Sequence, residues 1–357
     1  MNMKVLGIFR GFPGLGRVVS GVSLLETLRD QYNCDIEIIS YLQGNRYLES
    51  KGYKGLREAI PMDYCSIGLL PTNKMGVHIN NRIRSFSPNL IIVDGEPLIL
   101  HSIKISHPTI QVVCLLNPAD VDNPHNDKEA MDYFNYLYSL ADLAIVHGLR
   151  IPNPSYTYKS LLSVPTILRN EILNIRNKAA KDIYCILGGG TVNVGYQFES
   201  STISIANICK SLANKLPDYN MHIICSSQNI FDALNEGRET INVILHNEVL
   251  NAEEYFSNAA LVITRSGRNT LSELAYLGIP ALSFVTGDSY RCIEQEQNLK
   301  SISTKNILSV NSDTPLEVLY EKALFLINQG QTNNEYKAGN ESAIKEILSL
   351  VSNTNLY

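Results

Sequence analysis

The stretch that decides the fold is Ile263-Thr264-Arg265-Ser266-Gly267-Arg268-Asn269-Thr270-Leu271-Ser272-Glu273-Leu274. An apolar strand pattern runs into a polar turn, and a helical pattern follows directly. Thr270 and Glu273 have the S/T-x-x-E spacing of a capping box, in which both side chains close the first turn of a helix. The same pair also fits a ligand site, because a helix N-terminus attracts phosphate and an ionised carboxylate accepts hydrogen bonds from a ribose diol.

Outward from this stretch, short apolar runs alternate with helical patterns in both directions. Strands that alternate with helices form βαβ units and hence a parallel sheet. The predicted fold class is α/β, with two Rossmann-like, doubly wound domains facing a central cleft, since such sheets bind ligands at the carboxyl ends of their strands. The predicted strands are residues 4–9, 35–40, 90–93, 110–116 and 142–147, then 182–187, 220–225, 241–245, 260–264 and 281–285.

Composition limits the class of protein. The chain has 357 residues, a length that suggests two domains, and its net charge is −5 with a sequence pI of about 5.8. This charge argues against nucleic acid as the main partner, which would favour a basic face. Seven scattered cysteines without a C-x-x-C pair indicate reduced thiols. With no signal peptide and no apolar run of about 20 residues, we expect a soluble, cytoplasmic protein.

Two glycine-rich turns follow predicted strands. Glycine lets the backbone approach a ligand closely, and exposed amides can bind phosphate oxygens, although a tight turn explains the glycines as well. The first turn lacks the full G-x-G-x-x-G dinucleotide pattern, and the second lacks the G-K-[ST] of a Walker A loop. The candidate residues are Gly14, Gly16 and Arg17 in the first turn, and Gly189, Gly190, Thr191 and Asn193 in the second.

The segments 265–273, 275–281 and 294–298 together resemble the donor-binding region of glycosyltransferase family 28, the MurG-like superfamily. The second glycine turn resembles that family's loop, and 90–98 resembles a D-x-E-P-L segment of its relatives. The resemblance implies a GT-B fold, in which the C-terminal domain holds a nucleotide sugar. The domains implied are 1–165 on the acceptor side, 166–333 for the nucleotide sugar, and a helix in 334–357 that packs back on the first domain.

Carried over residue by residue, the resemblance implies a donor site. Thr270 would contact the diphosphate, Glu273 would contact the ribose, and Arg169 resembles a basic residue near the pyrophosphate. Gln295 and Asn298 match a Q-x-x-N pattern near the sugar. The remaining implied donor residues, besides the second glycine turn, are Arg265, Ser266 and Gly267.

One position departs from the family pattern. Many members carry His in the first glycine turn, where this chain has Arg17. Arginine stays protonated and cannot act as a general base, but it can hold a phosphate or carboxylate. Asp94 and Glu96 are then the best candidates for the base on the acceptor, because they follow strand 90–93; the alternative is that both are helix N-terminal acids. His147 is a weaker candidate.

Asp120 and Asp122 form a D-x-D sequence, which we interpret as a solvated acidic loop rather than a metal site. No cofactor and no metal are therefore expected, and helix termini and basic residues would stabilise the leaving diphosphate. We interpret the cations Lys74, Arg82 and Arg84 as part of a solvated helix face, so any membrane association would be peripheral.

The expected function is transfer of a sugar from a nucleotide diphosphate sugar, with UDP as the expected nucleotide. The acceptor would be a hydroxyl or amine of a small molecule, glycan or peptide, and transfer would be inverting and metal-independent. Two alternatives stay open. One is a nucleotide-sugar hydrolase or 2-epimerase on the same fold, and the other is a non-catalytic protein that binds a nucleotide sugar.

Overall fold

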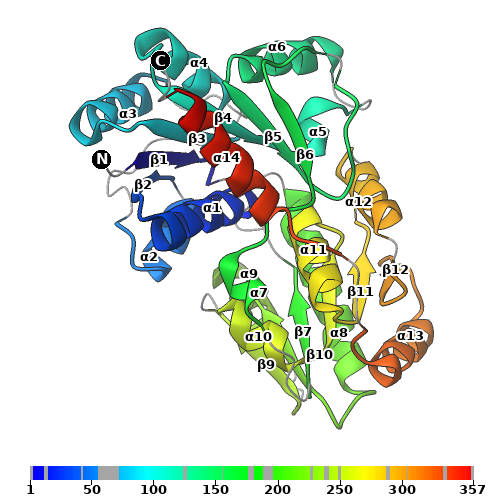
Figure 1. The fold of residues 1–357 in the computed structure, drawn as a ribbon. Coiled ribbons are helices and arrows are strands. Elements are labelled where there is room, and N and C mark those ends of the chain that lie inside the picture. The colour runs from blue at the N-terminus through cyan, green and yellow to red at the C-terminus, as the bar shows by residue number, and fades with distance from the viewer. Residues whose placement is uncertain are drawn as a thin grey trace. The chain divides into compact units, whose positions relative to one another are not determined.

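The computed structural model describes residues 3–11, 15–41, 43–54, 72–123, 127–154, 156–175, 181–187, 196–225, 228–236, 241–247, 251–286, 290–302, 304–332 and 336–354 (Figure 1). The chain divides into two compact units. The first is Met1–Asn170 together with Ala338–Tyr357, and the second is Glu171–Lys337. The sequence suggested a boundary at 165/166, whereas Ile167 belongs to the hydrophobic core of the first unit and Leu168 is buried there.

The first unit contains a six-stranded sheet with the order β2-β1-β3-β4-β5-β6, in which every neighbouring pair is parallel. The strand order reverses at β1, so the carboxyl ends of β1 and β3 form the switch point where such sheets bind ligands. The strands are β1 (Lys4–Phe9), β2 (Asp35–Ile39), β3 (Leu90–Asp94), β4 (Gln111–Leu116), β5 (Leu143–His147) and β6 (Leu161–Val164).

Seven helices among the described residues belong to this unit. The last of them lies beside the first in Figure 1, and its residues Ala343, Ile344 and Ile347 are buried in the same core as Val22 and Leu25. The helix that ends the described chain thus completes the core of the first unit. The helices are α1 (Gly16–Tyr32), α2 (Gln43–Ser50), α3 (Thr72–Phe86), α4 (Pro97–Ser106), α5 (Pro118–Val121), α6 (Lys128–Ser139) and α14 (Asn340–Thr354).

The second unit repeats this architecture with the strand order β12-β11-β10-β7-β8-β9, again wholly parallel. Here the order reverses at β7, so the switch point lies at the carboxyl ends of β7 and β10. At that edge the Thr264 hydroxyl donates to the carbonyl of Ile186 at 2.7 Å. The strands are β7 (Asp182–Ile186), β8 (Asn220–Ile224), β9 (Val243–His246), β10 (Ala259–Arg265), β11 (Ala281–Phe284) and β12 (Ile307–Val310).

Helices cover this second sheet, and α8 and α13 share one hydrophobic core with it. Gly278 ends α11 with a φ of 68°, a left-handed conformation that suits glycine. The helices are α7 (Asn170–Leu173), which crosses the division between the units, α8 (Tyr196–Ala213), α9 (Gln228–Asn235), α10 (Ala252–Asn258), α11 (Arg268–Leu277), α12 (Tyr290–Ser301) and α13 (Leu316–Gln329).

The predicted α/β, doubly wound class is confirmed, and each predicted strand overlaps an observed one. The sequence missed β6 and β12. Both are four-residue edge strands with partly exposed side chains, so neither shows the continuous apolar run of a buried parallel strand. Residues 161–164 form the edge strand that pairs with β5.

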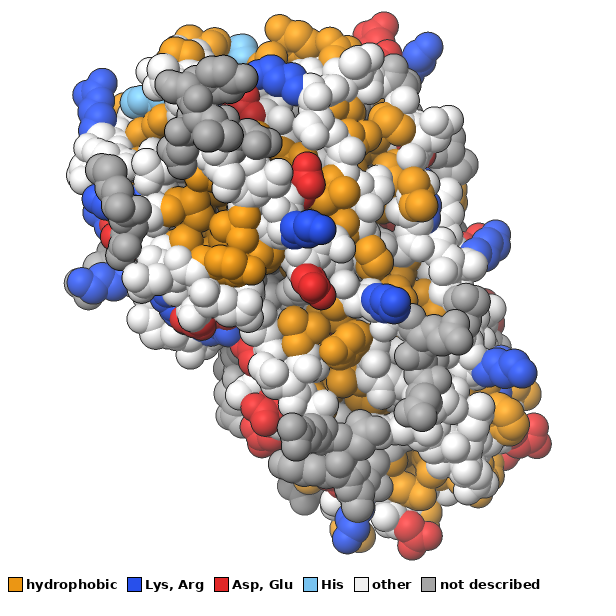
Figure 2. All heavy atoms as spheres, in the orientation of Figure 1, with side chains coloured by type: hydrophobic (Ala, Val, Ile, Leu, Met, Phe, Trp, Pro, Cys, Tyr) orange, Lys and Arg blue, Asp and Glu red, His pale blue; other side chains and the backbone are white. Residues whose placement is uncertain are grey.

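Two further observations concern the surface. None of the helices in the described parts of the chain is long and apolar enough to cross a membrane. Figure 2 shows acidic and basic side chains dispersed over the visible face, and the described part of that face has no continuous basic patch.

A pair of stacked histidines lies on the second sheet. His222 on β8 stacks against Tyr184 and His246, with ring centroids 4.6 Å and 5.1 Å away. Its Nδ1 atom hydrogen-bonds to Nε2 of His246 at 2.9 Å, so one ring donates and the other accepts. Burial lowers the pKa of His222, and His246 lowers it further, while Asp182 and Glu254 oppose the shift without cancelling it.

We expect the protein to lose stability as the pH falls below the ordinary histidine pKa of 6.5. The folded-state pKa of His222 lies below that value, so the unfolded state binds more protons in the window between them. This contribution to stability is complete above pH 6.5 and is lost as the pH falls towards the folded pKa. His222→Phe, which retains a ring in the stack, should reduce the fall in the urea midpoint between about pH 7.5 and 5.5.

The matched control for this prediction is His101→Gln on α4 of the first unit, which should leave the fall in the midpoint unchanged. An equal fall in the wild type and in His222→Phe would contradict the role given to His222.

Candidate active site

Five charged side chains gather at the switch point of the first sheet. Each comes from the segment that follows a strand: Arg10 follows β1, Asp94 ends β3, and Glu96 stands two residues later. Arg17 lies in the first turn of α1, and Asp120 lies in α5 after β4. Parallel neighbouring strands end at the same edge, which brings these residues together from positions up to 110 apart in the numbering.

Arg17 is bound by two carboxylates. Its Nη1 atom donates to Asp94 Oδ1 at 2.6 Å, and its Nη2 atom donates to both carboxylate oxygens of Asp120, at 2.8 and 2.9 Å. Gly95 makes room for this arrangement, with a φ of 78° and a position where a Cβ would lie 2.6 Å from Arg17 Cδ. The sequence suggested that Arg17 holds a phosphate or carboxylate of a ligand, but here both of its terminal nitrogens hold carboxylates of the protein.

The interpretation of Asp120 and Asp122 as a solvated acidic loop is wrong. Asp120 also accepts a hydrogen bond from the backbone N–H of Asn117 at 2.8 Å, in addition to its contacts with Arg17. Asp122 forms an ion pair with Arg150. The sequence could not show this, because each acidic residue finds its cation on a distant segment.

Only one of the two carboxyl oxygens of Glu96 is hydrogen-bonded within the described residues. Its Oε1 atom accepts from the Tyr41 hydroxyl at 2.5 Å and from Arg10 Nε at 3.4 Å. Its Oε2 atom is buried and has no hydrogen-bond partner among the described residues. Burial raises the pKa of the Glu96 carboxyl, and the opposing effect of Arg10 does not cancel this. Such a carboxyl accepts a proton more readily than an exposed one.

Asp94, Glu96 and His147 therefore differ as candidate bases. Asp94 is 0% exposed and bound by Arg17, so its carboxylate serves as a counter-ion. Glu96 flanks the N-terminus of α4, as the helix N-terminal alternative expects, but its side chain makes no capping hydrogen bond there. His147 is also 0% exposed, and its Nδ1 atom accepts from the backbone of Ile167, as expected of a core histidine.

In the second unit, α11 begins at Arg268, and Gly267 flanks it without any side-chain cap. Thr270 therefore lies inside the first turn, and the capping-box interpretation of Thr270 and Glu273 is wrong. The first backbone N–H groups of a helix have no partner within the helix. Gly267 is exposed, and a Cβ there would meet nothing within 4 Å, so the approach to this helix start is open.

The side chains just before this helix are engaged within the protein. Arg265 Nη2 donates to the hydroxyls of Ser201 and Thr202 on α8, at 2.7 and 2.6 Å. Ser266 is 0% exposed, and its hydroxyl shares a 2.7 Å hydrogen bond with that of Ser283. Both residues are among the donor residues that the family resemblance implies. In this structure they instead tie β10 to α8 and to β11.

Gln295 and Asn298 on α12 hold the same edge together. Gln295 Oε1 accepts from the backbone N–H of Thr286 at 2.8 Å, and Asn298 Nδ2 donates to the carbonyl of Ser266 at 3.1 Å. Each side-chain amide thus uses one of its two polar atoms in a hydrogen bond within the protein. The Nε2 end of Gln295 and the Oδ1 end of Asn298 are the ends that could face a sugar.

Glu273 is 1% exposed, so a ribose could reach its carboxylate only by displacing the groups that cover it. Arg169 is half-buried in the segment before α7. Four of the predicted donor residues lie at one edge of the second sheet: Gly267, Thr270, Gln295 and Asn298. The predicted residues that lie outside the described residues are Gly14, Gly189, Gly190, Thr191 and Asn193.

Sequence reasoning missed Tyr41, Tyr138 and the part played by Arg10. Tyr41 bonds to Glu96, while Tyr138 on α6 interacts electrostatically with Asp120 and with both arginines. No motif marks the tyrosines, since each stands in an unremarkable apolar segment. Arg10 directly precedes the first glycine-rich turn in the sequence, but its position beside Glu96 follows only from the pairing of β1 with β3.

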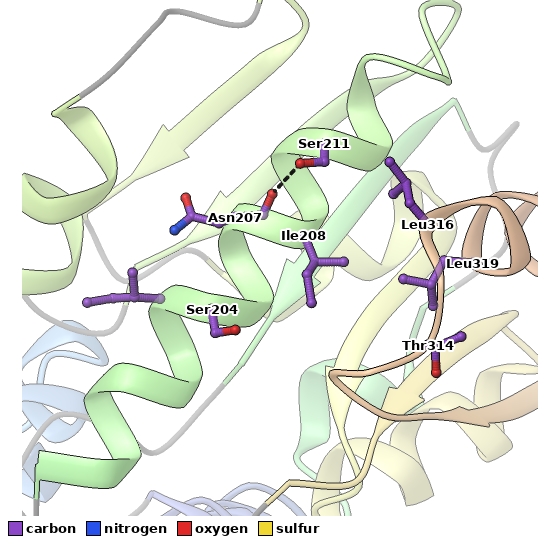
Figure 3. A pocket seen from close by; sticks show the side chains of 8 residues that line it. Ser204, Asn207, Ile208, Ser211, Thr314, Leu316 and Leu319 are labelled. Carbon is purple, nitrogen blue, oxygen red and sulfur yellow. Dashed lines mark hydrogen bonds between the residues drawn. The ribbon is translucent and has the colours of Figure 1, made fainter.

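A groove of about 700 Å³ lies elsewhere on the second unit, between α8 and the start of α13 (Figure 3). Ile208, Leu316 and Leu319 give it an apolar wall, and none of its lining residues is charged. None of the predicted site residues lines it. Its described lining holds no titratable side chain that could transfer a proton.

Two doubly wound parallel sheets of this kind define the GT-B fold, and solved GT-B structures match nearly the whole chain. MurG from Acinetobacter baumannii is 13% identical, with a TM-score of 0.56 over 97% of this chain and 99% of that one. A Methanocaldococcus jannaschii UDP-GlcNAc 2-epimerase, in complex with UDP-GlcNAc and UDP, is 14% identical, with a TM-score of 0.61 over 98% and 99%. The spinosyn rhamnosyltransferase SpnG, complexed with spinosyn aglycone, is 11% identical, with a TM-score of 0.61 over 98% and 96%.

Within this class, residues 194–351 match the glycosyltransferase family 28 C-terminal domain. This match confirms the family resemblance drawn from 265–298. The protein therefore has a MurG-like GT-B fold with a family 28 C-terminal domain. No curated protein sequence matches this chain.

Proposed function

We propose that the protein is a glycosyltransferase that moves a sugar from a nucleotide diphosphate sugar, with UDP as the expected nucleotide, to an acceptor hydroxyl or amine. The observation that carries this proposal is the family 28 domain over 194–351, whose open helix start at Gly267 lies at the switch edge of its sheet. A GT-B neighbour in complex with UDP-GlcNAc and UDP supports the choice of nucleotide.

The second unit would hold the donor. The backbone amides at the start of α11, with the Thr270 hydroxyl, would bind the diphosphate, and Glu273 would bind the ribose. Gln295 and Asn298 fix the loops after β10 and β11 and would turn their remaining amide ends to the sugar. Stabilising the departing diphosphate is the largest catalytic contribution expected of this edge, and it requires no metal or other cofactor.

The first unit would supply the base. In the proposed step, the acceptor O–H or N–H gives its proton to Glu96 Oε2 while its electron pair forms a bond to the anomeric carbon. The bond between that carbon and the diphosphate oxygen breaks, and the diphosphate leaves with the electron pair. Attack opposite the leaving group inverts the anomeric centre. Tyr41 and Arg10 hold Oε1, while the buried Oε2 has no hydrogen-bond partner among the described residues.

The fold also supports a second candidate, because a 2-epimerase matches it as well as the transferases do. A 2-epimerase would change UDP-GlcNAc without any acceptor, and a hydrolase would release free sugar. A non-catalytic binding protein would bind UDP and turn over neither. Incubation with UDP-GlcNAc alone, followed by analysis of the sugar, separates these cases from transfer.

The direct test of the donor site is calorimetric titration with UDP and with UDP-, dTDP- and GDP-sugars. We expect UDP to bind, and Glu273→Gln to weaken binding at least about tenfold, which is 1.4 kcal/mol. Glu321→Ala, an exposed residue on α13 of the same unit, should bind like the wild type.

Glu273 is buried, so the stability of Glu273→Gln must be measured in parallel. A folded variant that binds UDP as tightly as the wild type would remove Glu273 from the site. A folded wild type that binds none of these nucleotides would overturn the proposed function.

A further inference from the structure

The guanidinium of Arg10 has an unused end. Its Nε atom donates to Glu96 at 3.4 Å, and neither terminal nitrogen hydrogen-bonds to any described residue. The side chain as a whole is 12% exposed. Arg17 beside it differs, since Asp94 and Asp120 occupy both of its terminal nitrogens. Arginine presents paired donors that match the two oxygens of a carboxylate or phosphate.

The Tyr138 hydroxyl is the second unused donor at this edge. It interacts electrostatically with Asp120 and Asp94 as well as with Arg17 and Arg10, and it hydrogen-bonds to no residue in the described ranges. Burial raises the pKa of Tyr138, so the hydroxyl remains protonated and can donate. A guanidinium fork and a phenol are both donors, so together they suit a ligand that offers only acceptors.

The third element is the free oxygen of Glu96. Oε2 is buried and has no partner within the described part of the chain, in a residue that is 1% exposed, whereas Oε1 is fixed by Tyr41 and Arg10. A ligand oxyanion on Arg10 would therefore lie on the same guanidinium that contacts the Glu96 carboxyl.

We propose that Arg10 and Tyr138 bind a carboxylate or phosphate group of the substrate, next to the carboxyl that accepts the proton. This inference rests on the proposed function, which it deepens by giving the substrate a fixed anionic group at the first unit. The oxyanion can come from the acceptor or from the donor diphosphate, and the experiment below separates the two sources.

A bound anion changes the proton affinity of Glu96. The groups that face its carboxyl are Tyr41, Arg10 and Arg17, with Asp94 and Asp120 beyond them on Arg17. An added negative charge on Arg10 weakens the cationic field there, so Glu96 holds a proton more tightly once the anion is bound. Anion binding should therefore strengthen as the pH falls, and the bound anion should make Glu96 a stronger base.

The test uses sulfate, whose charge stays constant across the pH range, at constant ionic strength. In the full-length protein we expect sulfate to raise the unfolding temperature by about 2–4 °C more than chloride, the size expected at several times the dissociation constant. Arg10→Gln and Tyr138→Phe should each lose most of this difference. Arg29→Gln and Tyr53→Phe form the matched control, because Arg29 and Tyr53 are also hydrogen-bonded in the first unit.

Tyr138→Phe is the second variant in case Arg10→Gln does not fold, because it leaves the contact between Arg10 and Glu96 intact. A full sulfate response in folded Arg10→Gln and Tyr138→Phe would overturn the proposal, as would an equal loss in the control pair. Titration with UDP then identifies the source: binding weakened at least tenfold in Arg10→Gln indicates the donor diphosphate, and unchanged binding indicates the acceptor. A wild type that binds sulfate through Arg10 but no nucleotide would refute the proposed function alone.

Discussion

Arg17→Leu should lower the free energy of unfolding by about 3–5 kcal/mol, the usual cost of removing one partner from a buried ion pair. Asp94 is 0% exposed and lies 2.6 Å from Arg17, so the substitution would leave its charge in the interior without a counter-ion. Asp120 would lose the same partner but is 21% exposed and can recover water. Urea denaturation of both proteins at neutral pH measures the difference.

Two variants show whether the charge is the cause. Arg17→Gln combined with Asp94→Asn removes both charges and should be more stable than Arg17→Leu. Arg82→Gln breaks a more exposed pair with Glu37 and should cost about 1 kcal/mol or less. A loss of under 1 kcal/mol in Arg17→Leu would mean that Asp94 is neutral in the folded protein.

Glu96→Gln should lower kcat by a factor of about 10²–10⁴, the usual contribution of a general base, while UDP binding stays unchanged. The substitution preserves size and can still accept a hydrogen bond from Tyr41 through its carbonyl oxygen, but it cannot take a proton. The pH profile of kcat/KM should lose its acidic limb, which a merely structural role would not produce. Single-turnover transfer from the donor to a tested acceptor is the measurement.

The comparison variant is Tyr41→Phe, which keeps the base but frees Oε1. Tyr41 acts through Glu96, so we expect a smaller loss of kcat and a shifted acidic limb in the pH profile. Equal turnover in Glu96→Gln and in the wild type would exclude Glu96 as the base.

Most of the fold could be predicted because parallel strands covered on both faces are short, uninterrupted apolar runs. Residues 90–94 and 111–116 are of this kind, and the structure places them at the centre of the first sheet. The edge strands β6 and β12 were missed because half of each faces outward. Tertiary pairing, and not local sequence, makes Leu161–Val164 a strand.

The candidate site was only partly predictable. The sequence placed Asp94 and Glu96 at a ligand-binding edge but could not distinguish them, since both follow the same strand. Their difference comes from partners far along the chain: Arg17 neutralises Asp94, while Tyr41 holds one oxygen of Glu96. The capping-box prediction for Thr270 failed because α11 starts two residues earlier, at Arg268.

The placement of α14 has a consequence for synthesis of the chain. Residues 340–354 supply Ala343, Ile344 and Ile347 to the core of the first unit, although the whole second unit is translated between the two parts. The ribosome therefore releases residues 1–170 before the helix that covers their apolar surface exists. The second unit, which is continuous, can finish folding first. Until α14 is made, the nascent first unit must wait with part of its apolar core uncovered, a period in which a chaperone could bind it.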